Sequence, residues 1–371
     1  MKLGILGTGM IVREFLPWLT GADSPFTVQC ICSTQRSAEA AGELCEQYGI
    51  PQHTTNYFEL LQDVDVVYLA VPNNQHARYA KVAIEAGKHV IVEKPMAINA
   101  LQAEELANLA RRRKVFLFEA MTTQYLENYN KIRELLPRVG KVKLVQCNFS
   151  QYSSRYDAFC AGETPVSFDP ARAGGALMDL NVYNISYIVG LFGEPNQVHY
   201  TANIERGIDT SGILTMEYNS FRAVSIAAKD CGAPARYVIQ GTKGYILQKS
   251  TANWCGGVTF HPNEGKEEHY NLNGGQLGDH MLILGGLLPL RRFRVPLDLA
   301  DDGQAVDGMA APGQGDRTVV LDAFFFQPLL VHRGGVCIRH SVFSFCSVLH
   351  HHAPSNRRLS LCGRVIPLNF L

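Results

Sequence analysis

The chain has 371 residues, of which 46% are hydrophobic and 18% are charged. This composition is typical of a globular protein with a substantial core, and it argues against a disordered or collagen-like chain. Lysine plus arginine and aspartate plus glutamate both number 34, so the basic excess of a protein that binds nucleic acid or anionic lipid is missing. We therefore expect a small-molecule partner, with no nucleic acid and no membrane.

The length favours two domains, because single hydrophobic cores rarely grow beyond about 250–300 residues. The ten cysteines lie between Cys30 and Cys362 and form no CxxC pair, which favours free thiols in a reducing compartment over a disulfide framework or a zinc site. The N-terminal apolar run is too short for a signal peptide, and the longest apolar run, residues 281–290, is shorter than the ~20 residues of a membrane-spanning helix. We predict a cytoplasmic protein.

Residues 1–121 alternate short apolar runs with amphipathic stretches, as in successive β-α units around a parallel sheet. Helical spacing of alanine, leucine, glutamate and lysine predicts helices over 75–86 and 100–112. We predict an α/β domain of this region, a doubly wound Rossmann fold. Its expected strands are 2–6, 26–32, 64–71, 89–92 and 115–118.

Residues 122–275 contain longer strand-like segments in succession, interrupted by one predicted helix over 176–191. This order favours an α+β domain built on a mostly antiparallel open sheet. The expected strands include 141–149, 213–218, 223–228 and 237–240.

Residues 276–371 form an atypical segment, since no lysine follows Lys266 and the apolar runs lose their period. An irregular tail and an unusual folded terminus both remain open. The consecutive His350, His351 and His352 cannot all face one ion on a regular element, so we expect a solvated loop and no metal site.

The stretch 7–12, Gly-Thr-Gly-Met-Ile-Val, follows the first predicted strand and precedes a helical segment. Gly7 would permit a tight turn, and Gly9 would let the backbone approach a pyrophosphate at the helix N-terminus. The third glycine of the usual fingerprint is replaced by Val12, and a turn without a ligand is the alternative. We expect dinucleotide contacts from Gly7, Thr8, Gly9, Met10 and Ile11.

The second strand is followed by Ser33, Thr34 and Arg36 and not by the acidic residue that binds the adenine ribose of NAD. Hydroxyls and a guanidinium favour a 2′-phosphate, so NADP is expected in preference to NAD. Alternatively, Arg36 only faces water.

Taken together, five motifs resemble the glucose-fructose oxidoreductase, inositol dehydrogenase and rhizopine-catabolism (Gfo/Idh/MocA) family. They occur in the family's order over residues 1 to about 270, at 7–9, 70–76, 86–95, 174–179 and 241–244. The resemblance implies an oxidoreductase that transfers a hydride between a nicotinamide and a carbinol or carbonyl carbon. The substrate would be small and polyhydroxylated or cyclic, of the sugar, inositol or dihydrodiol type.

The resemblance also implies a catalytic group of Lys94, Tyr183 and Asp179, with Pro95 often in a cis peptide. Tyrosine at position 183 is similar to the branch of glucose-fructose oxidoreductase and dimeric dihydrodiol dehydrogenase. Tyr183 would exchange the proton on the substrate oxygen, and Lys94 would lower the pKa of Tyr183. Lys94 would also hold the substrate oxygen, and Asp179 would orient the cluster. Further cofactor contacts are expected from motif positions, namely Val71, Pro72, Asn73, His76, Glu93 and Lys94 itself.

Asn181, Asn184 and His76 are expected to line the site. Loop 151–167, with Tyr152, Arg155 and Tyr156, is expected to choose the substrate. Two alternatives stay open, a non-catalytic regulator of the same fold that senses dinucleotides and an enzyme inactive because its last strands differ. We also expect a homodimer or higher oligomer through the sheet of the second domain.

Overall fold

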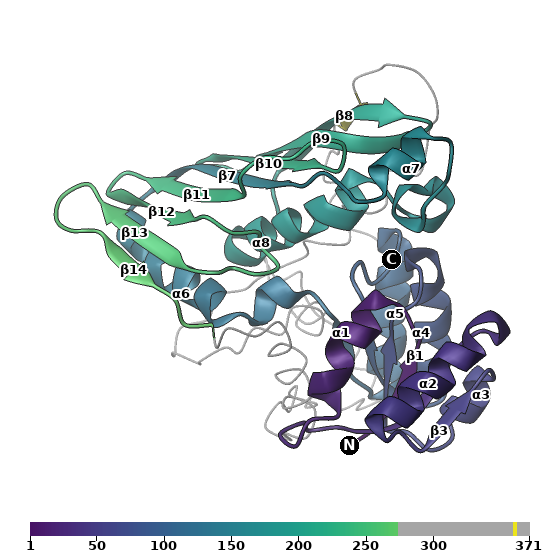
Figure 1. The fold of residues 1–371 in the computed structure, drawn as a ribbon. Coiled ribbons are helices and arrows are strands. Elements are labelled where there is room, and N and C mark those ends of the chain that lie inside the picture. The colour runs from purple at the N-terminus through teal and green to yellow at the C-terminus, as the bar shows by residue number, and fades with distance from the viewer. Residues whose placement is uncertain (274–358, 362–371) are drawn as a thin grey trace, which may run out of the picture.

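The computed structural model describes residues 1–273 and 359–361. These residues form two lobes, each built on one sheet, with the first lobe purple to blue and the second teal to green in Figure 1. Apart from the strand β15 (Leu359–Leu361), the expected irregular segment 276–371 and its three consecutive histidines lie outside the described residues. In the described part of the chain, no helix is both long and apolar enough to cross a membrane.

The first lobe contains a parallel sheet with the strand order β3-β2-β1-β4-β5-β6. The first and fourth of the five predicted strands, 2–6 and 89–92, match the structure, and the other three are shifted or shorter. The three-residue β3 was not predicted, because its polar sequence Gln-His-Thr carries no apolar period. The strands are β1 (Lys2–Leu6), β2 (Thr27–Cys32), β3 (Gln52–Thr54), β4 (Val66–Leu69), β5 (His89–Val92) and β6 (Leu117–Glu119).

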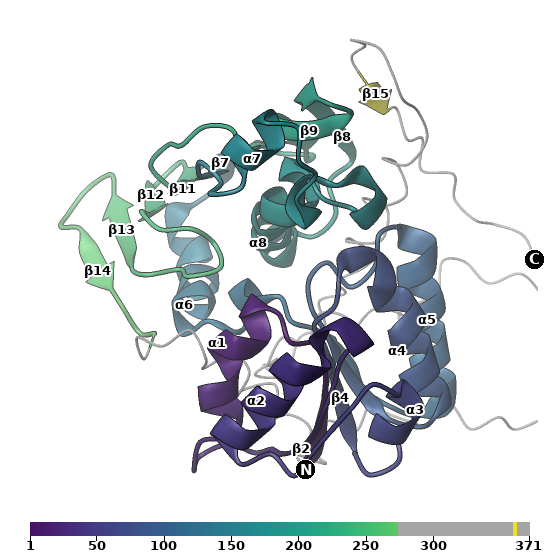
Figure 2. The same cartoon turned by 45° about the vertical axis from the view of Figure 1, so that its right-hand side comes forward.

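Helices cover both faces of this sheet, which confirms the doubly wound fold (Figure 2). On one face, Phe15 and Leu16 of α1 and Leu44 of α2 pack in the same core as Ile5 of β1. On the other face, α3, α4 and α5 bury their apolar side chains against the sheet. The helices are α1 (Met10–Leu19), α2 (Ala38–Tyr48), α3 (Tyr57–Leu60), α4 (His76–Glu85) and α5 (Ala100–Arg113).

The second lobe contains a mixed sheet with the order β14-β13-β12-β11-β7-β10-β9-β8-β15. Strands β7 and β10 pair in parallel and the remaining described pairs are antiparallel, as expected for the α+β lobe. The strands before β15 are β7 (Val142–Ser150), β8 (Gln197–Glu205), β9 (Ile208–Glu217), β10 (Arg222–Ala228), β11 (Arg236–Gly241), β12 (Gly244–Gln248), β13 (Val258–Pro262) and β14 (Glu268–Tyr270).

One face of this second sheet is covered by α6 (Glu127–Leu135) and α8 (Val182–Phe192), whose tyrosines Tyr129 and Tyr187 lie in the main core. The predicted helix 176–191 is not uniform, because a π-helical turn, Leu177–Asn181, precedes α8. The remaining short elements are α7 (Tyr156–Cys160) and the 3-10 turns Gln35–Ser37, Asn73–Gln75, Thr122–Tyr125, Leu136–Val139, Val166–Phe168 and Pro170–Arg172.

The two lobes meet where β4 and β5 of the parallel sheet end. Asn73 Nδ2 donates to Ala173 O at 3.0 Å, and Asn74 Nδ2 donates to Ala171 O at 3.0 Å. The carboxyl edge of the first sheet, where ligands of open α/β folds bind, therefore faces the π-helical turn of the second lobe.

Candidate active site

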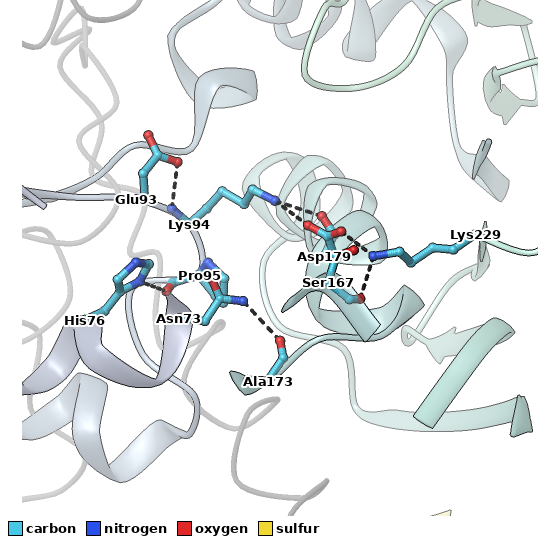
Figure 3. A network of polar contacts seen from close by, with 9 residues as sticks. All are labelled: Asn73, His76, Glu93, Lys94, Pro95, Ser167, Ala173, Asp179 and Lys229. Carbon is cyan, nitrogen blue, oxygen red and sulfur yellow. Dashed lines mark hydrogen bonds and ion pairs between the residues drawn. The ribbon is translucent and has the colours of Figure 1, made fainter. Parts of the chain in front are cut away.

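Lys94 links the two lobes. It follows β5 by two residues and precedes a cis peptide to Pro95, as the family resemblance implied. Its ammonium donates to the backbone oxygen of Asp179 at 2.9 Å and to Asp179 Oδ1 at 3.2 Å (Figure 3). The structure therefore brings together two of the three predicted catalytic side chains, which are 85 residues apart in the chain.

The Asp179 carboxylate also binds a second lysine, which sequence analysis missed. Lys229 Nζ lies 2.5 Å from Asp179 Oδ2 and approaches from the side opposite Lys94 (Figure 3). Burial alone would raise the pKa of Asp179, but the two ammonium groups lower it to about 2. Asp179 is therefore a carboxylate throughout the physiological range.

Tyr183 completes the predicted group. Lys94 Nζ lies 4.7 Å from the centre of the Tyr183 ring, and the Phe149 ring packs against the same tyrosine with a centroid distance of 5.8 Å. Burial raises the pKa of Tyr183, and Lys94 opposes that rise without reversing it. The expectation that Lys94 lowers this pKa thus describes one contribution and not the net shift, because the phenol is taken out of water. At neutral pH Tyr183 is a neutral phenol, able to donate a proton.

The ammonium of Lys94 stays charged. Burial opposes the charged form, but the neighbouring Tyr183 oxygen and the Asp179 and Glu93 carboxylates raise the pKa of Lys94 above its ordinary value. Lys94 can therefore act as a hydrogen-bond donor and as a fixed positive charge, and not as a base.

Glu93 points away from Lys94 Nζ, into the first lobe (Figure 3). Its carboxylate accepts hydrogen bonds from Tyr68 OH at 2.6 Å and from the Lys94 backbone N–H at 3.3 Å. Burial raises the pKa of Glu93, which the Tyr68 hydrogen bond opposes. Its contacts in this structure anchor the loop that carries Lys94.

The glycine turn before α1 fits the pyrophosphate of a dinucleotide. Gly7 has φ +126°, and a Cβ built there would lie 2.3 Å from Ala70 O, so the turn requires glycine. A Cβ at Gly9 would meet nothing within 4 Å, which leaves open space beside the helix N-terminus. The first turn of α1 carries no acidic residue that would repel an anion, and the exposed Met10 begins the helix.

The turn after β2 presents Thr34 and Arg36 to solvent, with Thr34 just before the 3-10 turn Gln35–Ser37 and Arg36 within it. Ser33 is buried and its hydroxyl donates to Thr34 O at 3.1 Å, so it is less available than sequence analysis suggested. A guanidinium and a hydroxyl at the end of the second strand suit a ribose phosphate.

His76 is fully buried and does not line the site. Its Nδ1 lies 2.7 Å from Pro95 O and its Nε2 lies 2.8 Å from Val71 O. Burial lowers the pKa of His76, so the ring is neutral and one nitrogen carries the proton. Its single N–H donates to only one of these two carbonyl oxygens. The buried ring packs between the loop after β4, which carries the predicted contacts Val71, Pro72 and Asn73, and the loop after β5, which carries Lys94.

The expectation that Asn181 and Asn184 line the site is wrong. Both are fully buried against the second sheet, where Asn184 Nδ2 donates to Ile226 O at 2.9 Å and to Asn181 Oδ1 at 3.0 Å. A π-helical turn changes which side chains share a face with Asp179, and it carries no sequence signature.

In the predicted substrate loop, two tyrosine hydroxyls already have carboxylate partners. Tyr152 OH donates to Asp157 at 2.6 Å, and Tyr156 OH lies 2.9 Å from both oxygens of Glu205. Their rings pack edge to face with centroids 5.5 Å apart. Among the described residues, no group of three or more His, Cys, Asp or Glu side chains is placed to hold a metal ion.

Lys229 follows β10, and a sequence signal for it existed. Ala223, Ser225 and Ala227 point inward along that strand, so the same alternation places residue 229 on the buried face. A lysine at an inward position needs a partner, which here is Asp179.

Two family models match the chain. The model described as "Oxidoreductase family, NAD-binding Rossmann fold" matches residues 1–121, and the model described as "GFO/IDH/MocA C-terminal domain" matches residues 129–247.

Among curated proteins, the chain is similar to the uncharacterized oxidoreductase YgjR of Escherichia coli (strain K12). The two are 32% identical over 266 residues, which is 71% of this chain and 80% of that protein. The chain is also 35% identical over 251 residues to scyllo-inositol 2-dehydrogenase (NADP(+)) IolU of Bacillus subtilis (strain 168). This match covers 67% of the present chain and 75% of IolU.

Among solved structures, the fold is similar to KijD10, a 3-ketoreductase from Actinomadura kijaniata in complex with NADP and TDP-benzene. The TM-score is 0.67 at 22% identity, covering 78% of this chain and 89% of that chain. At this identity the likeness shows a shared fold.

Proposed function

Because the chain belongs to the GFO/IDH/MocA oxidoreductase family, we propose that it is an NADP-dependent dehydrogenase or reductase acting on CH–OH groups of a small polyhydroxylated or cyclic compound. We further propose a division into a cofactor domain at 1–121, a substrate and dimerisation domain at 122–275, and a distinct segment at 276–371. The catalytic group is Lys94 and Tyr183, positioned by Asp179.

The observation that carries the proposal is the Lys94 ammonium bound to Asp179 beside the Tyr183 ring. These groups come from different lobes and meet at the carboxyl edge of the parallel sheet, the same edge that carries the glycine turn after β1. A regulator that only senses a dinucleotide has no need for a charged lysine paired with a protonated phenol at this edge.

The chemistry follows from the charge states of these side chains. When bound, the nicotinamide supplies or accepts the hydride. Lys94 donates a hydrogen bond to the reacting substrate oxygen, and its positive charge stabilises negative charge that develops there. Tyr183 gives its phenolic proton to that oxygen in the reductive direction and receives one in the oxidative direction. Asp179 keeps Lys94 aimed into the site through Oδ1 and its backbone oxygen.

NADP is favoured over NAD by the turn after β2, where Thr34 and Arg36 are exposed. The name of the relative IolU includes NADP(+), and the structural neighbour KijD10 was solved in complex with NADP, which agrees with this preference. The proposed cofactor contacts are Gly7, Thr8, Gly9, Met10, Ile11, Ser33, Thr34, Arg36, Val71, Pro72, Asn73, His76, Glu93 and Lys94, with Ser33, His76 and Glu93 acting through the loops they anchor.

We propose a homodimer through the face of the second sheet that α6 and α8 do not cover. Leu144, Ile213 and Tyr245 on three strands of that sheet are between 38% and 48% exposed. Apolar side chains gathered on a sheet face favour association with a second copy. Sedimentation velocity should give a mass of twice the chain, and a monomer at micromolar concentration would contradict this proposal.

The described cysteines, Cys30, Cys32, Cys45, Cys147, Cys160, Cys231 and Cys255, all carry free thiols. Free thiols are typical of a reducing compartment, so we propose a cytoplasmic protein. Fractionation of cells that express the native gene tests this location.

The decisive experiment for the function is a fluorescence titration with NADPH and with NADH, followed by a panel of inositols, sugars, ketosugars and dihydrodiols at saturating cofactor. We expect NADPH to bind more tightly and at least one panel member to be oxidised or reduced. Failure to bind either cofactor would overturn the enzyme function. Binding without turnover, even with wider panels, would point to the regulator.

A further inference from the structure

We infer that Lys229 is a positioning residue of the active site. In this assignment, which rests on the proposed function, Lys229 shares the Asp179 carboxylate with Lys94, so that Lys94 keeps uncompensated positive charge for the substrate oxygen.

The contacts of Lys229 are all internal. Its side chain is 3% exposed, and its ammonium lies 2.5 Å from Asp179 Oδ2 and 2.8 Å from Ser167 O, with the Phe168 ring centre at 4.7 Å. Two of the three N–H donors of this ammonium are taken by oxygen atoms, and the Phe168 ring adds a cation–π contact. Lys229 is therefore built into the structure and does not itself reach a substrate.

The three contacts join three segments. Lys229 extends from β10, Asp179 belongs to the π-helical turn, and Ser167 ends the loop expected to choose the substrate. The same Ser167 oxygen accepts the Gly175 N–H at 3.1 Å, just before the π-helical turn. One buried ammonium thus fixes the substrate loop and the catalytic carboxylate relative to each other.

The charge balance explains why a second lysine is useful. A carboxylate paired only with Lys94 would neutralise most of the positive charge that Lys94 offers to a substrate oxygen. Here Oδ1 accepts from Lys94 and Oδ2 from Lys229, so two cations share one carboxylate and these three side chains together carry a net positive charge. The excess charge lies at the exposed end, because the Lys94 side chain is 15% exposed and that of Lys229 is 3% exposed.

Other ionisable groups also act on the two lysines. Burial lowers the pKa of Lys229, and the Asp179 and Asp209 carboxylates oppose that shift. Tyr183 and Glu93 raise the pKa of Lys94. With Lys229 removed, Asp179 would lose one of the two cations that lower its pKa, so its carboxyl would protonate at a higher pH.

Lys229→Met removes the charge while keeping the length of the side chain. We expect kcat to fall on the order of 10- to 100-fold, as for the loss of one charged hydrogen bond. The acid limb of the kcat profile should move up by about one pH unit, because Asp179 protonates more easily. The Kd for NADPH should stay unchanged, since Lys229 lies in the second lobe.

Two variants serve as controls. Lys229→Arg should keep the acid limb in place, and Lys143→Met, at an exposed position, should leave kcat and its acid limb unchanged.

A double-mutant cycle separates positioning from general stabilisation. In an Asp179→Asn background, Lys229→Met should cost little further activity, because its effect passes through the carboxylate. Equal losses in both backgrounds, or an unmoved acid limb in Lys229→Met, would overturn the assignment. If Lys229→Met does not fold, Lys229→Arg decides the question, and a shifted acid limb in that variant would refute it.

The titration of the Asp179 carboxyl can be followed directly by ¹³C NMR, assigned with Asp179→Asn, and it needs no substrate. A wild-type protein without turnover would defeat the proposed function and leave this test intact. A carboxyl that titrates identically with and without Lys229 would defeat the inference even in an active enzyme.

Discussion

Tyr183 and Lys94 divide the work at the reacting oxygen, since one holds a transferable proton and the other a fixed charge. Burial keeps Tyr183 protonated at neutral pH, against the pull of Lys94. The neutral phenol is therefore ready to donate in the reductive direction, whereas the oxidative direction requires its proton to leave first. This asymmetry arises because burial takes the phenol out of water, which raises the pKa of Tyr183 although the Lys94 ammonium lowers it.

Tyr183→Phe removes the proton and keeps the ring. We expect kcat to fall by about 10²–10⁴-fold, the usual contribution of general acid-base catalysis, with the NADPH Kd nearly unchanged. Steady-state kinetics and fluorescence titration measure the two effects. Tyr245→Phe, at a half-exposed position on β12 of the second sheet, should retain full activity. A fully active Tyr183→Phe protein would rule out the assigned role.

Arg36 tests the cofactor preference at a single side chain. Arg36→Glu replaces an exposed cation with a carboxylate that would repel a 2′-phosphate, so NADPH affinity should fall on the order of 10- to 100-fold while NADH affinity does not. Fluorescence titration with both cofactors measures the ratio. The same charge reversal at the exposed Arg112 on α5 is the control, and equal losses for NADPH and NADH at position 36 would contradict the preference.

At the scale of elements, two glycines of one turn have different tasks. Gly7 has a positive φ and no room for a Cβ, whereas Gly9 has an ordinary φ of −69° and open space. The first glycine therefore shapes the turn, and the second keeps space free for a ligand at the N-terminus of α1.

Gly9→Ala and Gly7→Ala should separate these tasks. Gly9→Ala should leave the melting temperature near that of wild type and weaken NADPH binding on the order of tenfold or more, because its methyl occupies the space for the pyrophosphate. Gly7→Ala should itself lower the stability by about 1–3 kcal/mol or more, through backbone strain and the clash with Ala70 O. Thermal melts with and without NADPH measure both, and unchanged NADPH affinity in Gly9→Ala would place the cofactor elsewhere.

The elements that sequence predicted well are those with a strong apolar period. β1 and β5 are short apolar runs followed by turns, and their observed bounds agree with the prediction. β3 and β14 were not predicted because they are three residues long and polar, and they gain their stability from pairing with a neighbour. Such strands depend on tertiary contacts that no local pattern contains.

The residues of the candidate site also fall into those that the sequence predicted and those that it did not. The motifs and family resemblance predicted that Lys94, Asp179 and Tyr183 converge, and the structure places them together. Lys229 was missed because it follows its strand, where a lysine is ordinarily solvated, although the inward alternation along β10 pointed to burial. Asn184 was misplaced because the π-helical turn rotates the residues that follow it.

At the scale of the whole molecule, the active site is also a joint between lobes. Lys94 from the first lobe binds Asp179 of the second, and Asn73 and Asn74 add backbone contacts nearby. Motion between the lobes would therefore move Lys94 relative to Tyr183. A ligand that binds both lobes stabilises the folded protein by RT ln(1 + L/Kd), where L is the free ligand concentration, so the melting temperature should keep rising with ligand concentration after the site is saturated.

The pH dependence of global stability should carry the signature of Asp209, which fastens β9 to the start of the π-helical turn. Its Oδ2 accepts from Tyr200 OH and from the Leu177 N–H, both at 2.7 Å. Burial raises the pKa of this carboxyl from 3.8 to about 6, although both hydrogen bonds oppose the shift. Between these two pH values the folded chain binds the proton more tightly than the unfolded chain, so its contribution to stability is lost as the pH rises through the window.

Asp209→Asn keeps the shape and both acceptor contacts through the amide oxygen, and it cannot ionise. We expect the free energy of unfolding of the wild type to fall relative to this variant between about pH 4 and 6, with a constant difference above that range. Denaturant titrations at half-unit pH steps measure the difference. Other buried groups titrate as well, since burial raises the pKa of Glu93 and Glu119 and lowers the pKa of His76 and His89. Both proteins contain these groups, so their effects cancel in the comparison. The exposed Asp63→Asn should show no such window, and parallel curves for wild type and Asp209→Asn would mean that the carboxyl at position 209 titrates normally in the folded protein.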